Sequence, residues 1–540
     1  MPIPIPDSIV RRDFAARAIY SEAAGIARCI PAAVAVPRRP EDVQELVELA
    51  ITESTPLVPH GSGSGMAGGA VGTGIIVDLS RMQHLSDIDV SMRRVFAGPG
   101  ALRSAIEAAA RKHGLTFPVD PSSGAFCTVG GMAATNAAGA HSLKVGSTRR
   151  WVMALDCIFA DGTRGVVRRG ERPPDIPAIR RFLAEVHPAI VSTEAKELAH
   201  LSVRKESSGY ALHDYARSGD LVDLLVGSEG TLAIFTGVEL ALTPVACGTS
   251  SVLAAFASLD DAFSGAELAR EAKASTCELL DRTFLDLVVS RIGGAEIPAA
   301  TEAVLLAELE GSDDVEAAAA ATALSEIFRR AGGTYARVAL GHAEEASLWS
   351  LRHAASPILS ALDPSLRSMQ FIEDGAFPPG QVASYVRGVR KALGGRGIRG
   401  VIFGHAGDAH IHVNPLVDVS QRGWRDRVSS LLDEVADLTS QLGGTLTGEH
   451  GDGRLRTPLL ERVWSERARS LFAAVKRSFD PDGLLNPGVK VPLPHQSPLT
   501  DIKYDPTLPP LPPEVRAALD SVERDRAWHR FRLSLIPGSE

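Results

Sequence analysis

Short apolar runs separated by glycine-rich turns fill the first 245 residues. The runs at 56–59, 74–79 and 151–160 have the length and apolar content of buried strands. Apolar residues at helical spacing mark 43–50 and 101–112 as helices. We therefore predict a mixed α+β domain over 1–245, with its core from about residue 35.

From about residue 246 apolar strands are separated by alanine-rich helices. This alternation predicts an antiparallel sheet with helices on one face, which would form a substrate or cap domain over 246–425. Strands are predicted at 251–256, 303–308 and 400–403, and helices at 264–273, 315–331 and 381–394.

The C-terminal part is predicted to consist of returning helices and a tail. Within 426–495, helices at 426–442 and 463–478 are expected to pack back on the first domain. Residues 496–540 hold a proline cluster and one short charged helix, 514–529, a composition typical of a tail or docking segment.

Three segments rich in glycine and other small residues occur in the first domain, at 60–69, 128–139 and 227–234. Successive backbone N–H groups in such a loop form a nest that suits a pyrophosphate, and small side chains let a flat ring approach the backbone. The first loop joins two strands without a helix, so it is not the usual dinucleotide fingerprint. Taken singly, each segment fits a surface loop or a close-packed contact equally well.

Two later segments concentrate polar chemistry, at 404–415 and 447–453. If the first is extended, His410 and His412 point to the same face. Imidazole nitrogens with one carboxylate suit a borderline divalent metal, and an open coordination position would make such a site catalytic. The alternative is two polar loops whose histidines form only local hydrogen bonds.

Composition excludes several classes of protein. The chain has 540 residues, 45% of them hydrophobic, and a net charge of −9, which describes a soluble protein with room for two or three cores. Basic residues are dispersed, so no nucleic-acid partner is expected. Five scattered cysteines without a Cys-x-x-Cys argue against an iron–sulfur cluster and favour a cytoplasmic location, with peripheral attachment to a membrane left open.

In order and spacing, the three small-residue segments and the two histidine segments resemble the flavoproteins of the vanillyl-alcohol-oxidase family. The resemblance is strongest to FAD-linked D-lactate and D-2-hydroxyglutarate dehydrogenases and runs over roughly residues 25 to 490. It implies a two-part FAD-binding domain of the PCMH type and a ferredoxin-like α+β cap domain. The implied FAD-binding residues are Gly61, Ser62, Gly63, Ser64, Gly65, Pro121, Gly131, Asn136, Gly139, Gly230 and Asn486.

The chain departs from these relatives within the first loop. His60 stands where relatives usually carry an arginine. Some members of the wider family attach FAD to a histidine of this loop, but that position is Ser64 here. We therefore expect noncovalent FAD.

The resemblance also implies the catalytic residues. His405, His412 and Glu449 match the ligands of a divalent metal, with zinc the expected ion, and His450 matches the base. The implied reaction is oxidation of a D-2-hydroxy acid to the 2-oxo acid, with the hydride passing to flavin N5 and the metal polarising the hydroxyl. His410 lies where relatives often have asparagine, and we expect it on the solvent side.

Substrate size is predicted from two further positions. Arg352, in a segment similar to the family's carboxylate-binding turn, is expected to bind the substrate carboxylate through its guanidinium fork. The run 370–374 replaces the lysine that holds a second carboxylate in 2-hydroxyglutarate enzymes. This favours a smaller acid such as lactate or glycolate.

The partner that we expect is an electron acceptor. The electron acceptor could be a separate iron–sulfur subunit, a cytochrome or a quinone, and a homodimer is left open. Two other functions compete with the dehydrogenase. One is a metal-dependent hydrolase that uses the same histidines and glutamate. The other is a non-catalytic interaction subunit of an electron-transfer complex that docks through 496–540.

Overall fold

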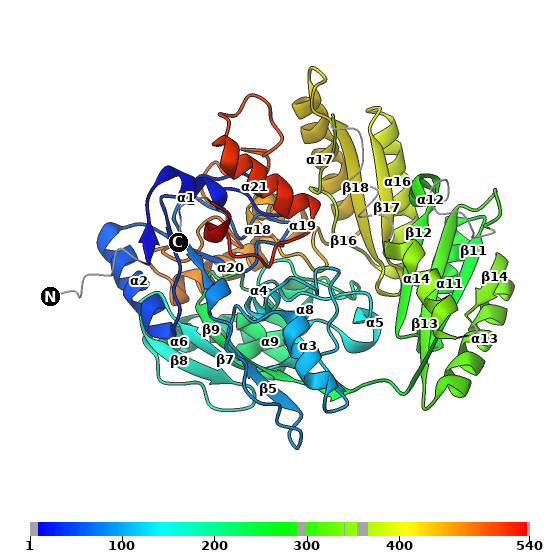
Figure 1. Ribbon diagram of the computed structural model, residues 1–540, viewed down its shortest axis with the longest axis horizontal. Helices are drawn as coiled ribbons and strands as arrows, with labels where there is room; N and C mark the ends of the chain where they lie inside the picture. Colours follow the sequence, from blue (N-terminus) through cyan, green and yellow to red (C-terminus); the bar gives the residue numbers. More distant parts are fainter. Residues whose placement is uncertain (1–8, 289–296, 340, 354–364, 537–540) are drawn as a thin grey trace.

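The computed structural model describes residues 9–288, 297–339, 341–353 and 365–536. Two lobes are visible, with the N-terminal and C-terminal segments in one and the large sheet of the middle of the chain in the other (Figure 1). Helices and strands are mixed in both lobes, so the α+β prediction is confirmed. No helix in these ranges is long and apolar enough to cross a bilayer.

The first sheet positions the glycine-rich loop. Its strand order is β1-β2-β4-β3, and β2 and β3 both run parallel to β4. The strands are apolar, as expected for a sheet covered by a helix. Helix α2 packs on them through its buried residues Val43, Leu46 and Val47. Loop 61–74 leaves the carboxyl end of β3 and returns to the start of β4. The bounds are β1 (Val10–Arg11), β2 (Ala33–Ala35), α2 (Pro40–Glu53), β3 (Leu57–His60) and β4 (Ile75–Asp78).

A second, antiparallel sheet completes the first lobe, with the strand order β5-β9-β7-β8. The helix α20 packs on α6, where the rings of Phe182 and Phe479 lie 5.3 Å apart. The helix expected at 463–478 thus lies against this lobe. The bounds are β5 (Arg94–Ala97), α3 (Arg103–Arg111), α4 (Val129–Thr135), β7 (Val152–Ile158), β8 (Arg164–Arg168), α6 (Pro177–Glu185), β9 (Ile234–Ala241) and α20 (Glu466–Phe479).

The cap lobe is built on one antiparallel sheet, ordered β14-β11-β13-β12-β17-β18-β15, with β16 beside β18. The strand bounds are β11 (Gly248–Phe256), β12 (Thr276–Asp281), β13 (Ala303–Gly311), β14 (Gly333–Val338), β15 (Leu366–Ser368), β16 (Gly375–Ala376), β17 (Arg399–His405) and β18 (His410–Asp418). The helix bounds are α11 (Leu259–Glu271), α12 (Arg282–Val288), α13 (Asp314–Arg330), α14 (His342–His353) and α16 (Val382–Gly394).

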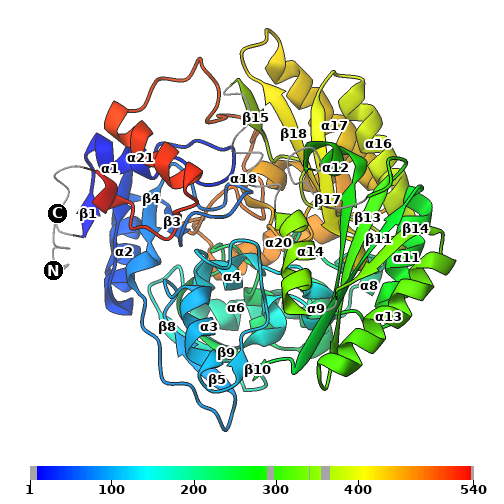
Figure 2. The ribbon, with the colours of Figure 1, turned by 45° about the vertical axis from the view of Figure 1, so that its right-hand side comes forward.

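Helices cover both faces of the cap sheet, so the prediction of helices on one face only is wrong. Along β11, Val252 and Ala254 pack in the cluster that includes α11, α13 and α16. Leu253 and Ala255 point to the other face, where α12 and α14 cover them. Figure 2 shows α13 and α14 on opposite sides of the sheet. The reason is that β11 is apolar on both of its faces, and each face is buried.

The helix α17 (Trp424–Gln441) packs in the cap lobe and not on the first lobe, contrary to the prediction for 426–442. Its buried residues Val428, Leu431 and Val435 join the same apolar cluster as Val386 and Val389 of α16. Helical periodicity identified the helix but carried no information about which lobe its apolar face would contact.

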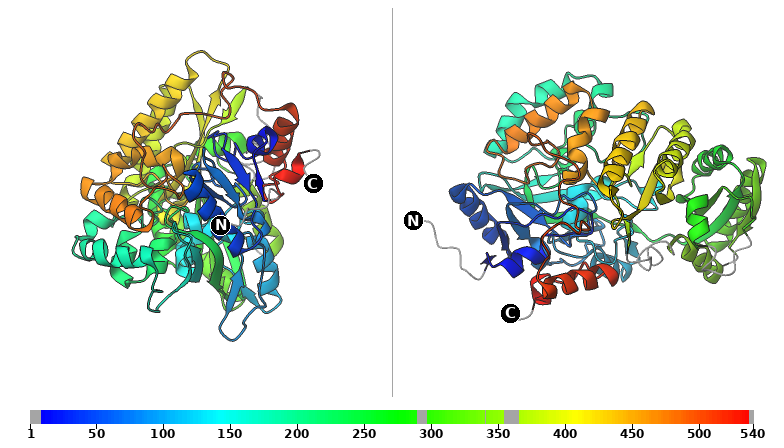
Figure 3. Two further views of the ribbon diagram at one scale, coloured as in Figure 1. Left: turned by 90° about the vertical axis from the view of Figure 1, so that its left-hand side faces the viewer. Right: turned by 90° about the horizontal axis from the view of Figure 1, so that it is seen from above.

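The segment 496–540 is packed, and it is not a free tail over its described part. Helix α21 (Pro513–Arg524) lies beside α1 (Phe14–Ile19), where Val515 and Leu519 share a cluster with Ile19 (Figures 1 and 3). The apolar side of this helix is thereby buried within the chain. The described part of this segment therefore belongs to the first lobe.

An ion-pair network joins the two lobes at His141. Its Nδ1 lies 2.6 Å from Asp120 Oδ2 in the first lobe, and its Nε2 lies 3.0 Å from Glu308 Oε1 in the cap. Burial lowers the pKa of His141, but the hydrogen bonds to Asp120 and Glu308 outweigh burial and raise it to about 11. The charged imidazole thus links the lobes near neutral pH.

The contribution of His141 to stability should depend on pH. Because its folded pKa of about 11 exceeds the unfolded value, the stabilisation is complete below about pH 6.5 and declines as the pH rises toward 11. We expect His141→Gln to lower the thermal midpoint more at pH 6 than at pH 9. The exposed His84→Gln is the control. An equal loss at both pH values would contradict the assignment.

Candidate functional site

Three histidines meet at the end of the β17–β18 hairpin. In the antiparallel register His405 pairs with His410, and Phe403 with His412. As the alternation predicted, His410 and His412 lie together, with ring centroids 4.6 Å apart. The two strands approach each other so closely here that only glycine fits at position 404, because a Cβ there would lie 2.3 Å from the His410 carbonyl oxygen. The hairpin therefore gathers imidazoles at one point of the cap sheet.

The three predicted metal ligands converge. His405 Nε2 lies 3.2 Å from Glu449 Oε1, His412 Nε2 lies 3.4 Å from the same oxygen, and the two Nε2 atoms lie 3.4 Å apart. Bonds of about 2.0–2.2 Å from one tetrahedral ion place ligand atoms about 3.3–3.5 Å apart. The geometry therefore fits one divalent ion held by His405, His412 and Glu449.

Outer partners orient each imidazole toward this point. His405 Nδ1 lies 2.5 Å from Glu278 Oε1, and His412 Nδ1 lies 2.9 Å from the Glu373 carbonyl oxygen, to which it donates. In both rings this leaves Nε2 facing the cluster, an arrangement typical of metal-binding histidines. Burial lowers the pKa of His405, but Glu278 and Glu449 outweigh it and raise the pKa to about 9. The site therefore attracts positive charge.

His410 is fully buried, so its expected place on the solvent side is wrong. Its Nε2 lies 2.8 Å from Asp374 Oδ1, and burial lowers its pKa to about 3. One of its ring nitrogens lies within 4.8 Å of the ligand atoms of His405, His412 and Glu449. The error arose because the partner, Asp374, comes from the segment before β16 and not from the hairpin.

His450 follows Glu449 and stacks on His412, with ring centroids 5.4 Å apart. Its Nδ1 lies 3.3 Å from Glu373 Oε1, and its Nε2 lies 3.9 Å from Glu449 Oε1. Burial lowers the pKa of His450, but Asp374 and Glu373 outweigh it, so the pKa lies above the ordinary value. With a proton on Nδ1 shared with Glu373, Nε2 is the atom that can accept another proton.

Buried supporting residues were missed by the sequence analysis. Asp374 accepts backbone N–H groups from Glu449 at 3.2 Å and from His450 at 2.9 Å. Arg456, fully buried, pairs with Glu373. These contacts hold the Glu449–His450 turn rigid, and no local pattern predicts them because their partners are far apart in sequence.

Lys205 is a further residue that was missed. Its Nζ lies 2.7 Å from Glu449 Oε2 and 3.0 Å from Ser142 Oγ. The pKa of Glu449 is raised by burial, but Lys205 and His405 lower it well below the usual range. The only sequence signal was the density of polar residues from 202 to 210, which does not single out Lys205.

Arg352, in α14, is linked to His405 through the carboxylate of Glu278. Its Nε donates to Glu278 Oε2 at 2.7 Å, and the other oxygen of Glu278 meets His405. The guanidinium carbon lies 4.6 Å from the centroid of the Phe403 ring. Arg352 therefore lies beside the cluster, while 354–356 of its predicted turn fall outside the described residues.

The small-residue segments also converge. A Cβ on Gly61 would lie 2.4 Å from Thr128 Oγ1 and 3.9 Å from Gly131 Cα, and one on Gly230 would lie 2.8 Å from Pro59. The Asn486 side chain donates to the Gly69 carbonyl at 3.1 Å and to the Glu229 carbonyl at 2.8 Å. The structure thus brings the first loop, the α4 segment, the Gly230 turn and the C-terminal return together.

The other predicted FAD-binding positions lie in the same loops. Ser62 Oγ donates to Ser64 Oγ at 3.0 Å, and Gly63 has a φ of +73°. A Cβ on Gly65 would meet nothing within 4 Å, so the backbone there is open to a ligand. Pro121 accepts a turn hydrogen bond from Gly124, Asn136 ends α4 with a φ of 55°, and Gly139 lies against Asp120. Such an open, glycine-lined cradle fits an extended dinucleotide.

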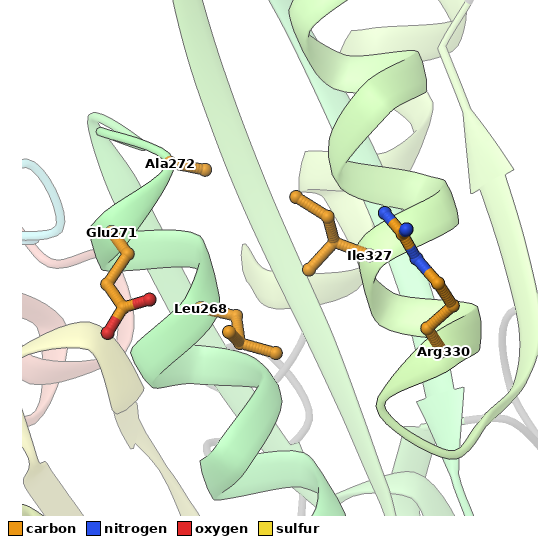
Figure 4. A pocket seen from close by; sticks show the side chains of 5 residues that line it. All are labelled: Leu268, Glu271, Ala272, Ile327 and Arg330. Carbon is orange, nitrogen blue, oxygen red and sulfur yellow. The ribbon is translucent and has the colours of Figure 1, made fainter.

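Two hollows are large enough to be candidate binding sites. A cavity of about 410 Å³ between the lobes is lined by Lys205, Ser142 and Asp408 among others, and so opens beside Glu449. A groove of about 420 Å³ lies between α11 and α13, where Leu268 and Ile327 point toward each other (Figure 4). The groove shares no lining residue with the histidine cluster, so the cavity at Lys205 is the one relevant to chemistry.

Two families match this chain over consecutive parts. An "FAD binding domain" matches residues 31–167, and "FAD linked oxidases, C-terminal domain" matches 248–489. A D-lactate dehydrogenase of Archaeoglobus fulgidus is 30% identical over 84% of this chain and 90% of its own length. The chain belongs to the FAD-linked oxidase family.

Other similar proteins agree with this assignment. A "Glycolate oxidase subunit GlcD" of Bacillus subtilis is 28% identical over 88% of this chain and 92% of its own length. Among solved structures, a 4-ethylphenol oxidase from Gulosibacter chungangensis has a TM-score of 0.65 and 17% identity, covering 90% of this chain and 95% of its own. p-Cresol methylhydroxylase has a TM-score of 0.63 and 14% identity, covering 90% and 94%. At these identities the structures show the fold alone, and they confirm the vanillyl-alcohol-oxidase (PCMH) type.

Proposed function

We propose that this FAD-linked oxidoreductase oxidises a small D-2-hydroxy acid, such as D-lactate or glycolate, to the 2-oxo acid. The observation that carries the proposal is the triangle of His405, His412 and Glu449 with His450 beside it. The names of the relatives support it, since they include D-lactate dehydrogenase, glycolate oxidase subunit and D-2-hydroxyglutarate dehydrogenase.

The residues divide the work of removing two hydrogens from one carbon–oxygen unit. A divalent ion at His405, His412 and Glu449, with zinc our choice, would stabilise the developing alkoxide. His450 Nε2 takes the hydroxyl proton, while Glu373 holds the ring through Nδ1. FAD, held noncovalently by the glycine-rich loops, would supply the acceptor for the hydride.

Arg352 is proposed to bind the substrate carboxylate. Its pairing with Glu278 positions the guanidinium next to His405, and its remaining N–H groups can form a fork on a carboxylate. In the segment 370–374, Glu373 and Asp374 are already committed to Arg456, His410 and the Glu449 turn. The segment itself contains no lysine or arginine for a second carboxylate, and this supports lactate or glycolate over a dicarboxylate.

An anaerobic substrate screen tests the function. The purified protein, mixed with D-lactate, L-lactate, glycolate or D-2-hydroxyglutarate, is followed by its visible flavin absorbance. We expect bleaching by D-lactate or glycolate and none by L-lactate. Because no acceptor is needed, the result does not depend on whether an iron–sulfur subunit, a cytochrome or a quinone takes the electrons. Failure of all D-2-hydroxy acids to bleach a flavin that dithionite reduces would refute the proposal.

A further inference from the structure

Arg532 carries a buried charge whose N–H groups have no hydrogen-bond acceptor among the described residues. The residue lies after α21 in the C-terminal segment and is 2% exposed. Within the described residues its Nε, Nη1 and Nη2 form no hydrogen bond. A buried guanidinium without acceptors is costly, because it loses its hydration and a contact with an aromatic ring face replaces only part of it. Its presence therefore points to an anionic ligand outside the polypeptide.

The guanidinium stands at the glycine-rich loop. An ideal Cβ on Gly63 would lie 3.2 Å from Arg532 Nη2 and 3.0 Å from His60 Nε2, which is also buried and without a hydrogen-bond partner. The loop is anchored behind this point, because the Gly63 carbonyl accepts the Ala24 N–H at 2.9 Å. Arg532 thus faces the loop whose open backbone fits the diphosphate of a dinucleotide.

The same segment also covers the second loop of the cradle. Arg526 Nη2 donates to the Ser122 carbonyl at 3.2 Å, and its guanidinium carbon lies 5.2 Å from the Phe126 ring centroid. Trp528 packs with Phe126, and the Arg532 guanidinium carbon lies 4.8 Å from the Trp528 ring centroid. The C-terminal segment therefore bridges 61–65 and 121–128, the two loops assigned to FAD.

Asp78, a carboxylate near enough to act on Arg532 electrostatically, is already bound by other groups. Asp78 accepts from the Tyr20 hydroxyl and from Ser80 N at 2.8 Å, and forms no ion pair with Arg532. Burial lowers the pKa of Arg532, and Tyr20 and Asp78 oppose that effect. An arginine stays protonated in proteins, so a full positive charge is available beside the loop.

We propose that Arg532 donates to a phosphate of FAD, so that the C-terminal segment completes the cofactor site. This part of the chain lies outside both matched family regions, 31–167 and 248–489. The planar fork suits a phosphate oxygen pair. The inference rests on FAD as the cofactor and not on the identity of the substrate.

Flavin binding tests the proposal directly. Apoprotein is titrated with FAD and with riboflavin, which has no phosphate, and flavin fluorescence is followed. We expect Arg532→Gln to weaken FAD binding by about 10- to 100-fold, the range for a charge-assisted hydrogen bond, and to leave riboflavin binding unchanged. Arg530→Gln, at an exposed neighbour, is the matched control and should change neither. Unchanged FAD affinity, or equal loss for FAD and riboflavin, would overturn the proposal.

Thermal unfolding separates this role from a purely structural one. Removing an unpaired buried charge should leave the midpoint of the apoprotein unchanged or raise it, whereas the increase on adding FAD should shrink. A structural role predicts the opposite, a lower midpoint for the apoprotein with a normal increase on adding FAD. Arg532→Lys should restore part of the FAD affinity. These readouts need no substrate, so they can fail or succeed independently of the proposed oxidation.

Discussion

His450→Gln is expected to lower kcat for oxidation of the hydroxy acid by about 100- to 10,000-fold, the usual range for loss of a general base. The physical reason is that Nε2 is the proposed proton acceptor, while Nδ1 lies 3.3 Å from Glu373 Oε1 and is held by it. The measurement is the rate of flavin reduction in a single anaerobic turnover. Flavin and metal contents should remain those of the wild type.

The control for His450 is His113→Gln, which changes an exposed histidine at the end of α3. It should reduce flavin at the wild-type rate. A His450→Gln variant that also does so would exclude a base at this position. It would favour the alternative of an interaction subunit if no substrate could be found for the wild type either.

Glu449→Gln is expected to abolish tight metal binding, and with it oxidation. The variant removes the only carboxylate of the ligand triangle, whose Oε1 lies 3.2 Å and 3.4 Å from the two histidine Nε2 atoms. Loss of a direct ligand should exceed the roughly 10- to 100-fold weakening typical of outer-shell substitutions. The measurement is the metal content after dialysis, together with titration by zinc and other divalent ions.

Glu48→Gln, at an exposed position on α2, is the matched control and should retain the wild-type metal content. FAD should stay bound to both variants, because the glycine-rich loops do not depend on Glu449. Retention of one metal per chain by Glu449→Gln would show that the ion is held elsewhere. A hydrolase built on the same residues is distinguished by activity that persists after FAD is removed.

The predicted ligands and base could be identified from the sequence, but the residues that support them could not. The predicted ligands and base lie in two short polar segments, at 405–412 and 449–450, which the local pattern singled out and whose residues received their roles from the family resemblance. Their supports, Glu278, Asp374 and Lys205, come from three other segments and meet the cluster only through the fold. A single carboxylate or lysine in an ordinary strand or loop carries no local pattern that marks it.

Burial was the property that the sequence predicted least well. His410 was expected at the solvent side because it lies where relatives often have asparagine, yet it is fully buried against Asp374. The 496–540 segment was expected to be a tail because of its prolines, yet Val515 and Leu519 are buried beside α1. In both cases the residues that make burial favourable lie far away in sequence. Their contacts can be seen only in the folded structure.

The amino-acid sequence by itself determined the α+β class, the positions of several strands and helices, the glycine-rich loops and two histidine-bearing segments that could hold a metal. These follow from local periodicity, from the backbone freedom of glycine and from the coordination chemistry of imidazole and carboxylate. Only the tertiary structure decided which lobe α17 joins, how Asp374 and Arg456 hold the site, and that Arg532 reaches the loop at Gly63. The physical reason is that burial and charge compensation depend on contacts between residues distant in sequence, and local patterns do not encode those contacts.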